Sequence, residues 1–108
     1  MAEPLVSIII PVYNAATHVA KCIETVRRQT YRNIEILLVN DGSSDASGPI
    51  CHMYARVDDR VRVIDKENTG VSATRNLALD LAKGDYIQFA DSDDYLRTNA
   101  TELLVQCA

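Results

Sequence analysis

Four short apolar runs alternate along the chain with four stretches of helical periodicity, and this alternation limits the folds that the chain can adopt. The runs are rich in β-branched residues, which favours strands; they are Leu5–Ile10, Ile34–Val39, Val61–Ile64 and Tyr86–Ala90. After each run, apolar residues recur with the spacing of an amphipathic helix, and Gly84 stands where the third helix would be capped. The stripes predict buried positions at Val19, Cys22, Ile23, Val26, Ile50, Met53, Tyr54, Val57, Val71, Thr74, Leu77, Ala78, Leu81, Ala100, Leu103, Leu104 and Cys107.

The resulting order is βαβαβαβα, with strand starts roughly 25 to 30 residues apart. That spacing is typical of right-handed βαβ units, so we expect a parallel sheet with helices on both faces. The first three strands build one side of the sheet, and the fourth returns beside the first. The sequence thus predicts one α/β domain over residues 1–108, a Rossmann-like three-layer sandwich with strand order 3-2-1-4.

Composition and charge exclude several classes of protein. Eleven Lys and Arg against fifteen Asp and Glu give a net charge of −4, which disfavours nucleic acid as a partner. No apolar run approaches the ~20 residues of a membrane span, and the start lacks the basic region of a secretory signal. Three widely spaced cysteines encode neither a disulfide framework nor a zinc site. We therefore expect buried, reduced cysteines in a cytoplasmic protein.

Polar residues follow the predicted strands, and in a parallel sheet they lie along one edge, where ligands bind. Asp91 and Asp93 follow the fourth strand one residue apart, so an extended backbone would project both carboxylates to one side. Two such oxygen donors suit Mg²⁺ or Mn²⁺. Turn and helix-cap chemistry is the alternative explanation for the acidic strings after the second and fourth strands.

Three further residues suggest a nucleotide. Asp41, beyond the second strand, can accept a hydrogen bond from a ring N–H of a pyrimidine, and Tyr13 can stack on such a base or pack against the rim. Arg75, early in the third helix, can bind a diphosphate or hold the acidic edge in place. A G-x-G-x-x-G or P-loop motif is absent from the sequence, which disfavours dinucleotide and P-loop folds.

Four segments in order resemble the successive motifs of family 2 glycosyltransferases: SIIIPVYN at 7–14, EILLVNDGSSD at 35–45, NTGVSATRNLAL at 68–79 and GDYIQFADSDDYL at 84–96. The resemblance covers about positions 4 to 100. It implies the A-type glycosyltransferase fold and a metal-dependent, hexosyltransferase-like enzyme of polysaccharide biosynthesis. Such an enzyme transfers sugar with inversion from a nucleotide-diphosphate sugar, usually UDP-linked, with Mn²⁺ or Mg²⁺ as cofactor.

The resemblance also implies roles for single residues. Pro11, Tyr13 and Asp41 would contact the nucleoside, and Arg75 would lie near the diphosphate or the acidic rim. Asp91 would approach the ribose or the metal, and Asp93 would be the chief protein ligand of the metal, with Asp94 a weaker candidate.

The family's acceptor half follows the acidic motif and carries the catalytic base, whereas this chain stops at Ala108, about 15 residues after Asp93. We therefore expect a donor-binding half, truncated before the acceptor half, with no catalytic base of its own and an exposed sheet edge at 86–90 through which copies could pair. The parent enzyme would be cytoplasmic, either free or at the cytoplasmic face of the membrane. The alternatives are a non-catalytic module that binds nucleotide and metal, and a receiver-like phospho-acceptor domain.

Overall fold

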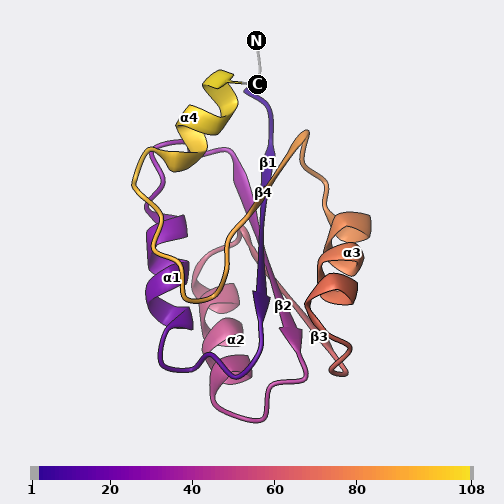
Figure 1. Cartoon of the computed structure of the whole chain (residues 1–108). Helices are drawn as coiled ribbons and strands as arrows, with labels where there is room; N and C mark the ends of the chain where they lie inside the picture. The colour runs from indigo at the N-terminus through magenta and orange to yellow at the C-terminus, as the bar shows by residue number, and fades with distance from the viewer. Residues whose placement is uncertain (1–2, 108) are drawn as a thin grey trace.

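The computed structural model describes residues 3–107, in which four strands alternate with four helices (Figure 1). The elements are β1 (Val6–Val12), α1 (Val19–Arg27), β2 (Ile34–Asp41), α2 (Ser47–Val57), β3 (Val61–Lys66), α3 (Val71–Leu81), β4 (Tyr86–Phe89) and α4 (Ala100–Cys107). None of the helices within this range has the length and apolar character that a bilayer span requires.

The sheet confirms the predicted topology. Its order is β3-β2-β1-β4, and all three pairings are parallel. The register places Ile9 opposite Leu37 on one side and opposite Phe89 on the other. Because β4 lies on the far side of β1 from β2, the chain reverses its direction of growth next to the end of β1, where open α/β sheets bind ligands.

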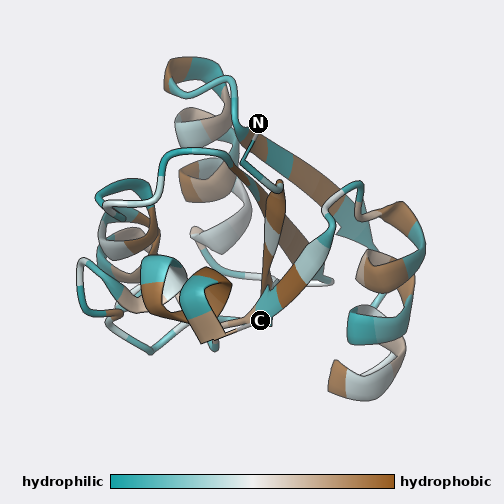
Figure 2. Cartoon of the chain, turned by 90° about the horizontal axis from the view of Figure 1, so that it is seen from above, coloured by the Kyte–Doolittle hydropathy of each residue, from teal (hydrophilic) through white to brown (hydrophobic). Residues whose placement is uncertain are grey.

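Alternation along the strands divides the core into two layers. Val6, Ile8 and Ile10 face α1 and α2, in a cluster that also receives Leu104 and Val105 of α4. Ile9 and Leu37 point to the opposite face and pack with Ala78 of α3. Figure 1 shows α1 and α2 on one side of the sheet and α3 on the other, and Figure 2 shows strands that are largely brown, with some teal and white segments, between helices of mixed colour. The three-layer prediction is therefore confirmed.

The strand ends differ from the prediction. β1 runs through Pro11 to Val12 instead of stopping at Ile10, while β2 and β3 extend to Asp41 and Lys66. Ile9 directs its carbonyl oxygen toward β4, where it accepts the Ala90 N–H, and Pro11 has the same orientation two residues later. The β1–β4 pairing stops at Ile9, so the missing N–H of Pro11 costs no ladder hydrogen bond.

Several predicted helix positions are wrong. Met53, Val57, Val71 and Leu103 are exposed, and so is Cys107, because α2, α3 and α4 bury narrower stripes than their apolar residues suggested. Gly84 is not a helix cap, since α3 ends at Leu81. It instead lies against β1, where a β-carbon would come within 2.4 Å of Ser7 Oγ.

Candidate functional site

A pocket of about 430 Å³, here called the donor-side pocket, opens at the carboxyl ends of β1 and β2. It brings together Pro11, Tyr13, Asp41 and Asp91, four of the residues that the sequence singled out. The remaining lining residues come from the end of β1, the loop before α3, α3 itself and the loop after β4, and are Val12, Asn68, Gly70, Val71, Thr74 and Ser92. Arg75 and Asp93 lie outside this lining.

Asp41 forms the inner wall of the donor-side pocket, and its side chain is only 5% exposed. Lys66 Nζ donates to Oδ1 at 2.6 Å, the Thr69 N–H to Oδ1 at 2.9 Å and the Gly70 N–H to Oδ2 at 3.1 Å. Burial raises the pKa of Asp41, but the bonds from Lys66, Thr69 and Gly70 outweigh it and hold this pKa below its ordinary value. The carboxylate therefore stays ionised in a nearly closed position.

Two loops hold this arrangement in place. Gly42 has a φ of +69° and lies so close to the loop before α3 that a β-carbon would come within 2.7 Å of the Asn68 nitrogen. Asn14 also has a positive φ, of 45°, and its Oδ1 accepts the Ser44 N–H at 2.8 Å. Positive φ favours Gly and is tolerated by Asn, so the residue types fit these two positions.

Three carboxylates gather after β4, and we call Asp91, Asp93 and Asp94 the acidic cluster. One oxygen from each lies within 4.8 Å of the others, and all three residues are exposed. The backbone is not extended there: the Asp91 N–H donates to Asp94 Oδ2 at 3.0 Å, and the Asp94 N–H returns to the Asp91 carbonyl at 2.9 Å. This turn, which the prediction of an extended backbone missed, is what adds Asp94 to the cluster.

The negative charge of the acidic cluster affects a cysteine in the core, Cys22. Cys22 Sγ donates to the Asp91 carbonyl at 3.3 Å. Burial, followed by the negative charges of Asp94, Asp93 and Asp91, raises the pKa of the Cys22 thiol to about 12. Cys22 is therefore an inert buried thiol beside a site that attracts cations.

Arg75 connects α3 to the acidic cluster. Its Nη2 lies 3.2 Å from Asp91 Oδ1, and its guanidinium carbon lies 5.5 Å from the centre of the Phe89 ring. Within residues 3–107 its Nε is buried without a hydrogen-bond partner. Arg75 thus forms an ion pair with the acidic rim, which agrees with one of the two predicted alternatives.

The most important residue that sequence reasoning missed is Lys66. The third strand was predicted to end at Ile64, so Lys66 was expected in the loop after that strand and was assigned no role. Asn68 was missed as well, although its Nδ2 donates to the Asp41 carbonyl at 3.1 Å. The signal available was Gly70, whose φ of +96° directly before α3 turns the loop over Asp41.

The donor set of the acidic cluster fits a divalent cation. Carboxylate oxygens are the hard ligands that Mg²⁺ and Mn²⁺ prefer. Asp93 makes no hydrogen bond or ion pair with other described residues, so both of its oxygens are available, whereas Asp91 shares one oxygen with Arg75. An apolar pocket wall beside such a cluster is suited to a nucleotide whose phosphates carry a metal.

Comparison with known proteins agrees with this chemistry. The family described as "Glycosyl transferase family 2" matches residues 7–108. The chain is 44% identical over 108 residues to the putative glycosyltransferase EpsH of Bacillus subtilis, covering 100% of this chain and 31% of EpsH. It is 46% identical over 103 residues to glycosyltransferase GlyG of Streptococcus pneumoniae, covering 94% of this chain and 34% of GlyG.

Among solved structures, TarS 1–349 of S. aureus superposes with a TM-score of 0.85 at 27% identity, covering 94% of this chain and 31% of TarS 1–349. The complex of the same protein with UDP-GlcNAc superposes with a TM-score of 0.84 at 26% identity, covering 94% of this chain and 30% of that one. The chain thus spans about a third of these proteins, and the match leaves no place for a receiver-like domain. The family match over nearly the whole chain, the A-type fold and the motif positions show that this chain belongs to glycosyltransferase family 2.

Proposed function

We propose that this chain is the donor-binding part of a glycosyltransferase and binds a UDP-linked sugar together with Mn²⁺ or Mg²⁺. The observation that carries the proposal is the position of the donor-side pocket next to the acidic cluster, with Asp91 belonging to both. The TarS fragment, which has this fold and is 26% identical, is described in complex with UDP-GlcNAc, and this supports UDP as the nucleotide.

Hydrogen-bond capacity at Asp41 fits one N–H of a pyrimidine base. A carboxylate offers about four acceptor positions. Lys66 and Thr69 use two on Oδ1, and Gly70 uses one on Oδ2, so Oδ2 retains one. Tyr13, 55% exposed at the mouth of the pocket, can stack on the base, and Pro11 can pack beside it.

The diphosphate would lie beside Arg75 and the acidic cluster, which are in contact with each other. Asp93 would be the chief ligand of the cation and Asp91 the second, with Asp94 as a further oxygen donor. The cation would supply electrostatic stabilisation of charge on the leaving diphosphate. The partly exposed guanidinium group of Arg75 would donate to a phosphate oxygen that the cluster alone would repel.

We further propose that sugar transfer, with inversion, needs residues outside the described chain. The carboxylates that line the donor-side pocket are Asp41 and Asp91, and both are already engaged by cationic side chains. Glu102 accepts a hydrogen bond from Thr30 Oγ1 at 2.8 Å, on the side of the sheet where β2 begins and away from the donor-side pocket. The chain by itself would therefore act as a nucleotide- and metal-binding module and show no transfer to sugar or lipid acceptors.

Two subsidiary proposals concern the setting of the enzyme. The open edge of β4, which is the last strand in the described sheet, would pair with further strands of the parent enzyme or with a second copy. The free cysteines support a reducing, cytoplasmic compartment.

The test is calorimetric titration of the chain with UDP, with and without Mn²⁺. We expect Mn²⁺-dependent binding, its loss in Asp93→Ala, and its retention in Asp80→Ala, which removes an exposed carboxylate of α3 that lies outside the donor-side pocket. Equal UDP affinity in Asp93→Ala and the parent chain, both with Mn²⁺, would refute the assigned metal site.

A further inference from the structure

A second pocket lies near the amino ends of β2 and β3 and belongs to no part of the proposed donor site. It measures about 520 Å³ and is lined by four arginines and four other residues: Arg27, Arg28, Arg32 and Arg60, with Glu24, Val57, Asp58 and Asp59. We call it the arginine pocket. Its residues come from the ends of α1 and α2, the loop before β2 and the turn before β3, whereas the residues of the donor-side pocket follow the strands.

Asp58 holds two of the arginines in place, and all of its acceptor positions are occupied. Its carboxylate accepts Arg27 Nε at 3.1 Å and Arg60 Nε and Nη2, each at 3.1 Å, and it also accepts the Arg60 N–H at 3.0 Å. The side chain is 10% exposed. Two guanidinium groups are thereby fixed in place, and Asp58 has no acceptor position left for the other arginines.

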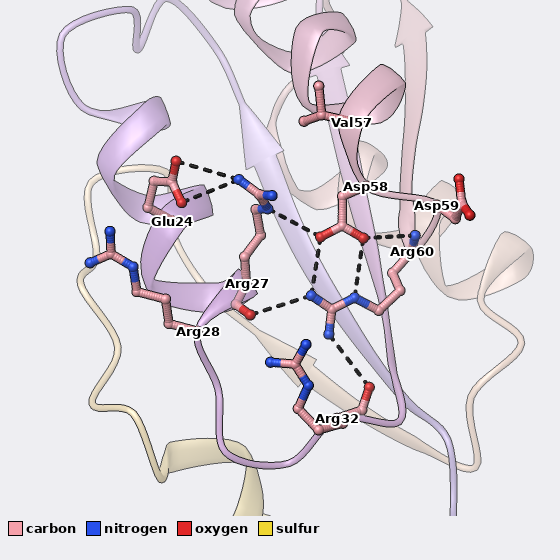
Figure 3. Close-up of a pocket in the computed structure, with 8 residues that line it drawn as sticks. All are labelled: Glu24, Arg27, Arg28, Arg32, Val57, Asp58, Asp59 and Arg60. Atoms are coloured by element: carbon pink, nitrogen blue, oxygen red, sulfur yellow. Dashed lines mark hydrogen bonds and ion pairs between the residues drawn. The ribbon is translucent and has the colours of Figure 1, made fainter.

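Arg28 and Arg32 supply unbalanced positive charge beside this fixed pair. In Figure 3 neither guanidinium group carries a dashed line, and within residues 3–107 neither makes a hydrogen bond or ion pair. Glu24 is taken by Arg27 at 3.3 Å and by the Tyr54 hydroxyl at 2.9 Å. Asp59 points away from the arginines in the same view.

The arginine pocket has a slight excess of positive charge in a negatively charged chain, because its four arginines outnumber the three acidic residues Glu24, Asp58 and Asp59. The chain carries a net charge of −4, yet four of its eleven Lys and Arg line this one hollow. Arg28 directly follows α1 and lies at the negative end of that helix, which accounts for a basic residue there. The same account leaves Arg32 unexplained, because Arg32 lies in the loop before β2 and is exposed.

We propose that the arginine pocket binds a phosphate-class oxyanion, with Arg28 and Arg32 as its principal donors. Planar guanidinium groups donate in pairs to the oxygens of a tetrahedral phosphate. Arg27 and Arg60, whose guanidinium groups are held by Asp58, would add positive charge beside the bound anion. The anion could be free phosphate or the phosphate of a lipid headgroup, which present the same oxygens. The proposal is independent of UDP binding, because the two pockets share no residue.

The experiment titrates the ¹⁵N-labelled chain with sodium phosphate, at ionic strength held constant with sodium chloride, and follows the arginine Nε–H resonances by NMR. We expect saturable shifts at Arg28 and Arg32, and a loss of affinity of about tenfold or more in Arg28→Gln/Arg32→Gln. Arg56→Gln is the matched control, since Arg56 is an exposed arginine of α2 outside the pocket. It should leave phosphate binding unchanged.

Two further arms decide the source of the phosphate and check the fold. Co-sedimentation with phosphatidylcholine vesicles, with or without phosphatidic acid, that is abolished in the double variant would identify a lipid headgroup; phosphate binding without vesicle binding would identify a free anion. Unchanged circular dichroism would show that the double variant is folded. Shifts that do not saturate, or equal phosphate affinity in the double variant and the parent chain, would overturn the proposal.

Discussion

Lys66 Nζ lies 2.6 Å from Asp41 Oδ1, and this ion pair closes the inner wall of the donor-side pocket. Lys66 is 15% exposed and Asp41 is 5% exposed at the side chain, so both charges are largely withdrawn from water. Lys66 also bonds Thr69 Oγ1 and the Glu67 carbonyl. The ammonium group therefore neutralises the carboxylate and ties down the loop that covers it.

Lys66→Met should destabilise the chain strongly, because removal of one partner of a buried ion pair leaves an uncompensated charge. We expect a loss of about 3 kcal/mol in the free energy of unfolding, measured by urea denaturation at neutral pH. The double variant Lys66→Met/Asp41→Asn should recover part of that loss, since no buried charge remains, whereas the Asn amide nitrogen would face the N–H of Thr69 or Gly70. A single variant as stable as the parent would show that the pair is solvated in solution.

The same pair explains why sequence reasoning found the end of the sheet where the donor-side pocket lies but did not find the inner wall of that pocket. Asp41 was identified because it follows an apolar run. Its partner was not, because β3 is short and its alternation gives no sign that it continues to Lys66. A strand boundary misplaced by two residues hides a contact that depends on register, here Asp41 opposite Lys66.

Gly42→Ala and Gly70→Ala should both destabilise the chain, but only Gly42→Ala adds a steric contact to the backbone strain. At Gly70 nothing lies within 4 Å of an added β-carbon, and its φ of +96° with a ψ of 163° is a conformation open essentially to glycine, so backbone strain alone accounts for a loss of about 1–3 kcal/mol. At Gly42 the cost of a positive φ is joined by a contact of 2.7 Å with the Asn68 backbone, which cannot move without opening the pocket. We expect a loss of about 2–3 kcal/mol by urea denaturation and weaker UDP binding.

UDP binding that is as tight in Gly42→Ala as in the parent chain would contradict this account. It would mean that the Asn68 loop gives way without cost and that its approach to Gly42 does not shape the pocket.

Tyr13→Ala should weaken binding of UDP but not of pyrophosphate, both measured with Mn²⁺ by calorimetry. Tyr13 is exposed, so the fold should be unaffected, and loss of stacking on a base costs about 1–3 kcal/mol. Asp93→Ala should weaken both ligands, because each needs the cation. If Tyr13→Ala weakened pyrophosphate as much as UDP, the aromatic ring would not be placed at the base.

Fold topology was predictable because it depends on patterns that many residues share, whereas single side chains depended on context. The alternation of strands and helices gave the order β3-β2-β1-β4 before any contact was known. Met53 and Val57 were expected in the core and are 48% and 64% exposed, because periodicity cannot tell how much of a helix its neighbours cover. The acidic turn of Asp91–Asp94 likewise requires backbone hydrogen bonds that spacing alone does not reveal.

Glu35→Gln should loosen the connection between α3 and β1. The Glu35 carboxylate accepts the Ser7 hydroxyl, the Lys83 N–H at 2.6 Å and Arg62 Nη1 at 3.3 Å. Burial raises the pKa of Glu35, but these three donors outweigh it and lower this pKa overall. Its stabilising contribution is therefore present above the ordinary glutamate pKa and is lost as the pH falls through the lower, folded value.

In Glu35→Gln, the amide group turns a donor toward a donor of Arg62, and we expect a loss of about 1–3 kcal/mol at neutral pH. Faster hydrogen exchange of the Lys83 and Gly84 amides would report the loosened end of α3. Unchanged exchange there would show that Glu35 does not hold it.

Asp58→Asn should remove a defined part of the acid sensitivity of the chain. Hydrogen bonds from Arg60 come first among the causes that lower the pKa of Asp58 to about 2, with Arg27 adding to them against the cost of burial. Because the folded pKa is depressed, this stabilisation is complete above the unfolded value of ~4 and disappears as the pH falls from there through about 2. The shift corresponds to about 2 kcal/mol at neutral pH.

Denaturation of Asp58→Asn and the parent chain between neutral pH and acid should show a gap in the free energy of unfolding that narrows toward pH 2. A gap that is constant over the whole range would show that the lost stability comes from packing and not from the charge of Asp58.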